Sequence, residues 1–308
     1  MRRGKMNKKS LIEWEESRVI LREKDTSYHN LVPIVTNNGK VILMCGKKDN
    51  NNTKERKMIR LKSDDNGENW IEACNVENSP GDILSLGHGV CLDSGKLVIA
   101  GVENLDNNER KLFVMTSTDD GDTWSIVYAE ENTENLWSTD NLNSWELLNT
   151  VKPHDATLGE HIQVVEYAND QVYISCSLEN SNQRLTAYSN DGCETFEIDN
   201  ELLEANPECQ GGIVRLPTKT DEYYQIAMAS HGNETKKDLT LYLSEDGCKT
   251  WCQFNTLGAV NARESDLAYY SVKEGKKEAE GIVCVYSYGS DTEGYKIGMQ
   301  LNSNKEIM

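Results

Sequence analysis

Residues 117–124 read STDDGDTW, and three other octapeptides of the chain follow the same pattern. They are SDDNGENW at 63–70, SNDGCETF at 189–196 and SEDGCKTW at 244–251. The four copies begin at 63, 117, 189 and 244, so successive starts lie 54, 72 and 55 residues apart. A repeat of this length matches a four-stranded propeller blade with its connection. The repeat therefore predicts an all-β propeller.

Each octapeptide has the chemistry of a tight turn between two strands. The aspartates Asp65, Asp119, Asp191 and Asp246 can accept backbone N–H bonds from the turn that follows them. The glycine supplies a positive φ, and the final aromatic residue begins the next strand. In the last two copies cysteine replaces this glycine and a glycine stands one position earlier, so we expect a shifted turn there.

The segments between the repeats read as short apolar strands separated by polar turns. Asn-Gly in NNGK and Ser-Gly in DSGK are hairpin signals. Five strand-rich units are evident, at about 28–72, 88–126, 160–198, 208–253 and 265–302. Residues 127–157 are predicted to form long loops, with STDNLNSW at 138–145 as an insertion.

Composition limits the classes of partner. The formal net charge of −19 argues against nucleic acid, whose binders usually carry a basic patch. Residues 1–15 are expected to form a flexible basic tail and residues 16–308 a single propeller domain. No apolar run reaches the roughly 18 residues of a membrane span, and no apolar signal region follows the basic start. The expected location is cytoplasmic, with secretion left open for a trimmed chain.

The nine cysteines predict no metal site. Cys248 and Cys252 form the closest pair, but no second pair of cysteines or histidines follows at zinc-finger spacing. Cysteines inside apolar runs, such as Cys45 and Cys284, are expected to be small buried hydrophobic residues. We expect reduced thiols and no cofactor.

The four octapeptides resemble the Asp-boxes, or BNR repeats, of the sialidase (neuraminidase) superfamily. The resemblance implies a six-bladed propeller with the boxes on the edge away from the active site. Because only five units are evident, either the N-terminal SRVILRE strand and weakly patterned segments build a sixth blade or the ring has lost one.

The same resemblance implies catalytic residues. LAYYSV, at 267–272, is similar to the element that carries the tyrosine nucleophile, which assigns that role to Tyr270. Glu160 matches the base that activates the tyrosine, with Glu166 and Glu208 as alternatives. Asp49 is the best match to the general acid, although its loop also reads as a solvated turn.

The three arginines that hold the substrate carboxylate in the family are not found at the matching positions. Leu31 stands at the first, Ser177 beside Cys176 at the second, and Lys236 or Lys237 at the third. A lysine supplies charge without the planar guanidinium fork. His88, in a GHGV segment similar to a pocket-facing strand of the family, is a further candidate ligand contact.

These residues predict a propeller that acts on or binds a glycan, or another small polar ligand, through a degenerate sialic-acid site. One alternative is an active exo-α-sialidase whose arginines come from other positions, with Arg56, Arg60, Arg184, Arg215 and Arg263 available. A non-catalytic interaction scaffold is the other alternative. The sequence leaves catalytic activity and oligomeric state open.

Overall fold

The computed structural model of the chain is built of β-strands and turns, with no helix in the part it describes. The described residues are 1, 3–6, 12–51, 56–77, 79–105, 110–128, 137–138, 157–179, 183–190, 195–203, 211–231, 239–257, 262–274, 277–290 and 294–303. The all-β class predicted from the repeats is confirmed.

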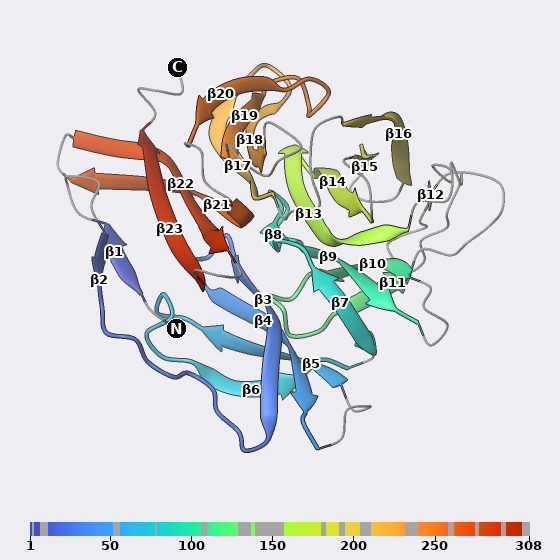
Figure 1. Cartoon of the computed structure of the whole chain (residues 1–308), viewed down its shortest axis with the longest axis vertical. Coiled ribbons are helices and arrows are strands. Elements are labelled where there is room, and N and C mark those ends of the chain that lie inside the picture. The colour runs from blue at the N-terminus through green and yellow to red at the C-terminus, as the bar shows by residue number, and fades with distance from the viewer. Residues whose placement is uncertain are drawn as a thin grey trace.

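Five sheets follow one another along the chain, and each is one blade of a propeller (Figure 1). Blade 1 consists of β3 (Thr26–Val35), β4 (Val41–Asp49), β5 (Arg56–Ser63) and β6 (Ile71–Asn75). Blade 2 consists of β7 (Asp82–Leu86), β8 (Val90–Cys91), β9 (Leu97–Asn104), β10 (Arg110–Ser117) and β11 (Ser125–Tyr128). Blade 3 consists of β13 (Leu158–Ala168), β14 (Gln171–Leu178), β15 (Arg184–Ser189) and β16 (Thr195–Leu203), with β12 (Trp137–Ser138) on its outer edge. Blade 4 consists of β17 (Ile213–Lys219), β18 (Tyr224–His231), β19 (Leu239–Ser244) and β20 (Cys252–Thr256). Blade 5 consists of β21 (Ala262–Glu274), β22 (Lys277–Ser290) and β23 (Gly294–Ser303).

The N-terminal region forms a hairpin and no sixth blade. Strands β1 (Gly4–Met6) and β2 (Ile12–Trp14) pair only with each other, inside the segment predicted to be a flexible tail. Residues 15–25, which include SRVILRE, are not in a strand; Ile20 and Leu21 pack instead on the outer face of blade 1. The described chain therefore has the five blades that the sequence units indicated, and the sixth blade implied by the resemblance is not formed there.

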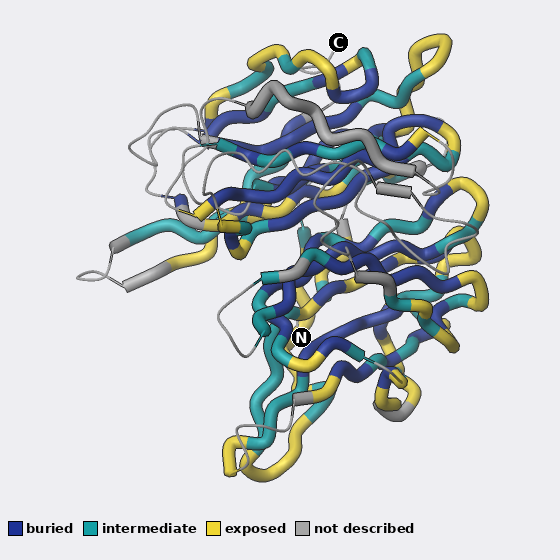
Figure 2. Tube along the Cα trace, turned by 90° about the vertical axis from the view of Figure 1, so that its right-hand side faces the viewer, coloured by how far each residue is buried: buried dark blue, intermediate teal, exposed yellow. Residues whose placement is uncertain are grey.

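Neighbouring blades are held together by apolar side chains on facing sheets. Four clusters join blade 1 to 2, 2 to 3, 3 to 4 and 4 to 5 in turn. Strands β9, β13 and β14 are buried along most of their length, and many exposed residues lie at the turns (Figure 2). Burial between blades is the main source of stability, at about 25 cal/mol for each Å² of apolar surface removed from water.

Blade 5 and blade 1 share no apolar cluster among the described residues. The N-terminal segment covers the outer face of blade 1 at β4 and β5, but β3 and parts of blade 5 stay exposed. On β3 every second side chain is exposed, with Leu31 at 59% and Val35 at 63%. On blade 5 the same holds for Ile297, which is 81% exposed, and to a lesser degree for Val285 and Met299. The ring of blades is therefore less closely packed on this side.

The Asp-box turns are built as the sequence predicts. In the box of residues 117–124, Ser117 Oγ donates to Asp119 Oδ1 at 2.8 Å and accepts the Gly121 N–H at 2.9 Å. The Asp119 carboxylate accepts the Thr123 N–H at 2.9 Å, and Trp124 Nε1 donates to the Gly121 carbonyl at 3.2 Å. Equivalent serine and aspartate bonds hold the first and fourth boxes, and Trp70 Nε1 makes the same bond in the first. In the fourth box, Trp251 Nε1 has no partner among the described residues. Asp191, of the third box, lies outside the described residues.

The shifted turn expected in the fourth box is not observed. Both central residues of each described box have positive φ: Asp120 and Gly121 at 54° and 75°, and Gly247 and Cys248 at 76° and 66°. The Cys248 N–H still donates to Ser244 Oγ, as the second glycine does elsewhere. Because the turn needs two left-handed residues, moving the glycine from the second to the first leaves its geometry unchanged.

The boxes also define the two ends of the ring. Each box follows the third strand of its blade, which runs parallel to the first because adjacent strands are antiparallel. The turn after each inner strand therefore lies at the box end, and the start of each inner strand lies at the opposite end. The resemblance places the family's active site at that opposite end.

We expect Asp119→Asn to lower the free energy of unfolding by roughly 1 kcal/mol at pH 7, because the turn loses charge-assisted hydrogen bonds. Burial is the largest single effect on Asp119 and opposes its ionisation, but the bonds from Thr123 and Ser117 together outweigh it and lower the pKa of Asp119 to about 2. A depressed carboxyl pKa stabilises the fold above the unfolded-state pKa of 3.8, and the benefit is lost as pH falls toward 2. Urea unfolding at several pH values should therefore show the two proteins converging between pH 4 and 2.

Asp64→Asn is the matched control, since it removes the same charge from an exposed position of the first Asp-box, at residues 63–70. Equal losses in the two variants would show that the Asp-box bonds add nothing to stability.

Candidate ligand site in the central channel

His88 is brought to the centre of the ring by the glycines on either side of it. A Cβ on Gly87 would lie 2.8 Å from the Ile162 carbonyl oxygen of β13. One on Gly89 would lie 2.4 Å from Ile34 Cγ1 of β3. The segment between β7 and β8 can therefore approach both neighbouring inner strands closely only because these positions carry no side chain.

Three blades meet at His88. Its Nδ1 lies 3.2 Å from Asp266 Oδ1 of β21, across the ring, and its backbone N–H donates to Gln163 Oε1 of β13 at 3.2 Å. Burial alone would lower the pKa of His88, but the hydrogen bond and the charge of Asp266 outweigh it and raise the pKa above its ordinary value. The pair is thus a charge-assisted contact between blades 2 and 5.

These contacts set the positions of β13, β17 and β21, and of the His88 segment, relative to one another along the ring axis. We call the position along this axis the height. His88, Gln163 and Asp266 lie at one level, and a Cβ on Gly212 of β17 would lie 2.6 Å from Asp266 Cα, which puts Gly212 at the same level. Residues on neighbouring inner strands can therefore be compared in height by counting from this level, at about 3.3 Å per residue.

Tyr270 and Glu160 lie at different heights along the ring axis. Glu160 lies three residues from Gln163 toward the end opposite the boxes, and Tyr270 lies four residues from Asp266 toward the box end. Seven regular strand residues would span about 23 Å, and the bulge of β13 between Leu158 and Ile162 makes the actual separation along the axis shorter than this. This register does not bring together the tyrosine and glutamate implied by the resemblance, and the described part of the chain has no hydrogen bond between them.

The other predicted site residues are at the end opposite the boxes. Asp49 ends β4, where its carboxylate accepts the Asn51 N–H at 2.8 Å. Leu31 is exposed on β3. Ser177 is buried, and its hydroxyl accepts the His161 N–H at 3.1 Å, so it supports β13. Lys236 and Lys237 lie outside the described residues.

The arginines available elsewhere do not converge where the structure describes their side chains. Arg60 pairs with Asp122 of an Asp-box at 3.1 Å. Arg184 is buried in blade 3, where Nε donates to Ser175 Oγ at 2.7 Å. Arg215 pairs with acidic residues at the box end. Nothing is described of the Arg56 and Arg263 side chains.

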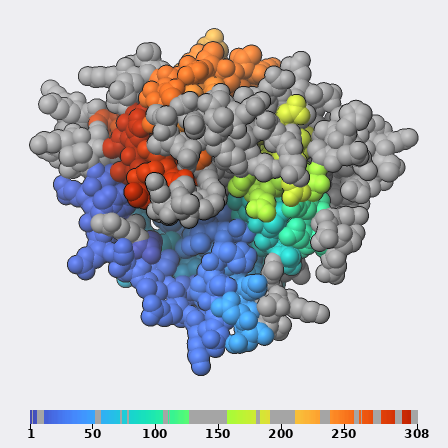
Figure 3. Space-filling model, in the orientation of Figure 1, coloured from blue at the N-terminus to red at the C-terminus, as the bar shows by residue number. Residues whose placement is uncertain are grey.

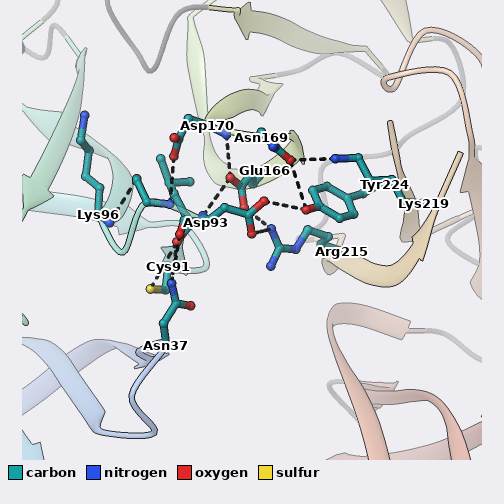
Figure 4. Close-up of polar contacts among 12 residues, drawn as sticks. Asn37, Cys91, Asp93, Lys96, Glu166, Asn169, Asp170, Arg215, Lys219 and Tyr224 are labelled. Atoms are coloured by element: carbon teal, nitrogen blue, oxygen red, sulfur yellow. Dashed lines mark hydrogen bonds and ion pairs between the residues drawn. The ribbon is translucent and has the colours of Figure 1, made fainter. Parts of the chain in front are cut away.

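A second polar cluster lies at the box end of the inner strands (Figure 4). Glu166 of β13, the alternative base, is buried and pairs with Arg215 of β17. Arg215 also contacts Asp93 at 2.8 Å and stacks 4.5 Å from the centre of the Tyr224 ring. Tyr224 in turn donates its hydroxyl hydrogen to Asp93 at 2.6 Å.

Glu166 holds blades 2, 3 and 4 together. Its Oε1 accepts the N–H groups of Asp93 at 3.0 Å and Asp170 at 2.8 Å, while the Arg215 guanidinium binds Oε2. Burial raises the pKa of Glu166, and these contacts offset only part of that rise. All of its contacts are structural, so Glu166 serves packing of blades 2, 3 and 4.

Asp266 and Gln163 are the site residues that sequence reasoning did not single out. Asp266 follows Glu264 and Ser265 in a strand whose alternation gave no reason to prefer it. Gln163 is buried in an apolar run, and its Nε2 has no hydrogen-bond partner in the described part of the chain. A polar residue inside the run IQVVEYA was the one available signal.

The fold is a sialidase-like β-propeller, and its described blades follow one another around the molecule in chain order (Figure 3). The chain belongs to the BNR repeat-like domain family, whose model matches residues 3–277. No curated protein matches the sequence.

The solved structures that resemble the chain include two sialidases. A Hadza microbial sialidase superposes with a TM-score of 0.65 at 16% identity, over 94% of this chain and 57% of that protein. Trypanosoma rangeli sialidase gives a TM-score of 0.64 at 13% identity, over 94% and 47%. A protein of unknown function from Dyadobacter fermentans gives 0.57 at 14% identity, over 92% and 81%. The chain spans about half the length of these sialidases, and identities this low establish the fold alone.

Nowhere in the described ranges does a helix have the length and apolar character needed to cross a membrane. The described His, Cys, Asp and Glu side chains include no group of three or more that could hold a metal ion.

We expect Arg215→Met to lower the free energy of unfolding by about 3 kcal/mol, because it leaves the buried Glu166 carboxylate without its cation. Adding Glu166→Gln should recover part of this loss, since the buried charge is then removed as well. Urea unfolding of both proteins measures the effect.

Arg60→Met is the control. Its partner Asp122 is 63% exposed, and such surface pairs contribute about 1 kcal/mol or less. If Arg215→Met were no more destabilising than Arg60→Met, the pair of Glu166 and Arg215 would not stabilise the contact between the blades.

Proposed function

We propose that this protein binds a glycan in the central channel of its propeller, through a site derived from a sialidase but lacking its carboxylate-binding arginines. The observation that carries this proposal is the position of the described arginines. Arg60, Arg184 and Arg215 are each held by different partners in blades 1, 3 and 4, and Leu31 stands where the first family arginine is expected.

The comparison structures support the glycan class. One of the Trypanosoma rangeli sialidase structures contains sialic acid, and it superposes on 93% of this chain with a TM-score of 0.65. Loss of one buried charged hydrogen bond costs about 1.5–3 kcal/mol. Two lost guanidiniums would therefore weaken binding of a sialic-acid carboxylate about a hundredfold or more relative to an intact arginine site.

The register supports a site without efficient sialidase chemistry. A retaining sialidase mechanism needs the base within hydrogen-bond reach of its tyrosine. Tyr270 and Glu160 lie on opposite sides of the level of His88 along the ring axis, which supports a site that does not use this pair. An active exo-α-sialidase, with Asp49 as acid, remains the alternative for which turnover is the decisive evidence.

Turnover of a fluorogenic sialoside tests the choice. We expect the protein and its Tyr270→Phe variant to show the same rate, no greater than that of buffer. Tyr269→Phe is the matched control, since Tyr269 lies on the opposite face of the same strand and donates to Glu280. Turnover that Tyr270→Phe abolishes and Tyr269→Phe preserves would establish the sialidase alternative.

Calorimetry with a panel of sialylated and neutral oligosaccharides tests binding itself. We expect saturable binding of at least one sugar at one site per chain. Absence of saturable binding to every sugar would overturn the proposal and leave the interaction scaffold.

A further inference from the structure

Where blades 2, 3 and 5 meet, two ligating atoms are not used by the fold. In the described part of the chain, His88 engages Asp266 through Nδ1 and Gln163 through its backbone N–H, and its Nε2 has no partner. Asp266 Oδ1 binds His88 and the Leu267 N–H, at 2.9 Å, while Oδ2 has no partner among the described residues. The side chains are 24% and 52% exposed, so part of each remains open to a small ligand.

A buried donor beside this pair also lacks a partner. Gln163 is 1% exposed; its Oε1 holds the His88 backbone, and its Nε2 has no acceptor. Buried polar groups are nearly always hydrogen-bonded to protein or to ordered water. The unmatched amide shows that the protein does not satisfy every polar group at this level of the ring.

We propose that His88 and Asp266 form a subsite for the hydroxyl groups of a neutral sugar, in which His88 Nε2 and Asp266 Oδ2 bind one or two adjacent hydroxyls. The inference rests on the proposed glycan function and names its ligand class. A hydroxyl is both donor and acceptor, so it can satisfy an accepting carboxylate and an imidazole nitrogen at once.

Charge favours a neutral sugar over an acidic one. The site contains a carboxylate beside its one cationic group, and the chain as a whole carries −19. A sugar carboxylate would meet Asp266 as a like charge, with no arginine among the described residues to offset it. The groups facing His88 are Asp266 from β21, the neutral Gln163 from β13, and the apolar Val32 and Ile34 of β3 beside Gly89.

The pH dependence separates the two ligand classes. Below its pKa, His88 donates from both nitrogens; above it, with Nδ1–H held by Asp266, Nε2 becomes an acceptor. A hydroxyl can bind either form, whereas a carboxylate only accepts and needs the protonated form. Neutral-sugar affinity should therefore stay within about threefold across the titration of His88, while N-acetylneuraminic acid should bind more weakly throughout and lose affinity as pH rises.

Calorimetry with lactose, maltotriose, triacetylchitotriose and N-acetylneuraminic acid tests the subsite. His88→Asn retains an amide near the Nδ1 position but lacks the distal nitrogen, and Asp266→Asn keeps an oxygen for Leu267. Each should weaken neutral-sugar binding about tenfold to a hundredfold. Asp221→Asn, which removes one charge from an exposed turn at the box end, should leave it unchanged.

An NMR titration of the histidine ring carbons tests the pair without any ligand. His88 should titrate above 6.5 in the native chain and lower in Asp266→Asn, with no change in Asp221→Asn. An unchanged His88 titration in Asp266→Asn would overturn the pair while leaving glycan binding elsewhere in the channel intact. Tighter binding of N-acetylneuraminic acid than of every neutral sugar would overturn the ligand class, and no binding of any sugar would overturn the proposed function as well.

Discussion

The faces of each blade in this protein need an apolar neighbour, and most of the structure follows from that constraint. Blades 1 to 5 meet this need in sequence, through four clusters in which side chains of one sheet pack on the next. Such packing has no direction of its own, so polar contacts set how the blades align. Glu166 with Arg215 does this at the box end, and His88 with Asp266 does it across the centre.

The two polar contacts have different consequences because their surroundings differ. Glu166 has both oxygens engaged and is 2% exposed, so a ligand has nothing to bind there. His88 and Asp266 are more exposed and each keeps one atom free. A polar contact between blades thus serves packing when all of its hydrogen-bonding atoms have partners. It becomes a candidate ligand site when one of these atoms has none.

The Asp-box turns show how local chemistry survives sequence change. The two central residues take left-handed conformations in every described box, and the serine and aspartate satisfy the backbone around them. Cys248 has a positive φ where the first two boxes have glycine, and it is buried against blade 3. The Asp-box turn therefore keeps its geometry in the fourth box although the residues at the centre of the turn have changed.

The sequence by itself determined the all-β class, five strand-rich units and the Asp-box turns, because spacing, turn chemistry and strand alternation are local properties of the chain. It left open whether a sixth blade completes the ring, and the resemblance of GHGV to a family strand indicated His88. It could not place Asp266 or Gln163 beside His88, nor separate Tyr270 from Glu160 in height, because those relations depend on the stagger between strands of different blades. Only the tertiary packing sets that stagger, since close contacts at Gly87, Gly89 and Gly212 fix one inner strand against the next.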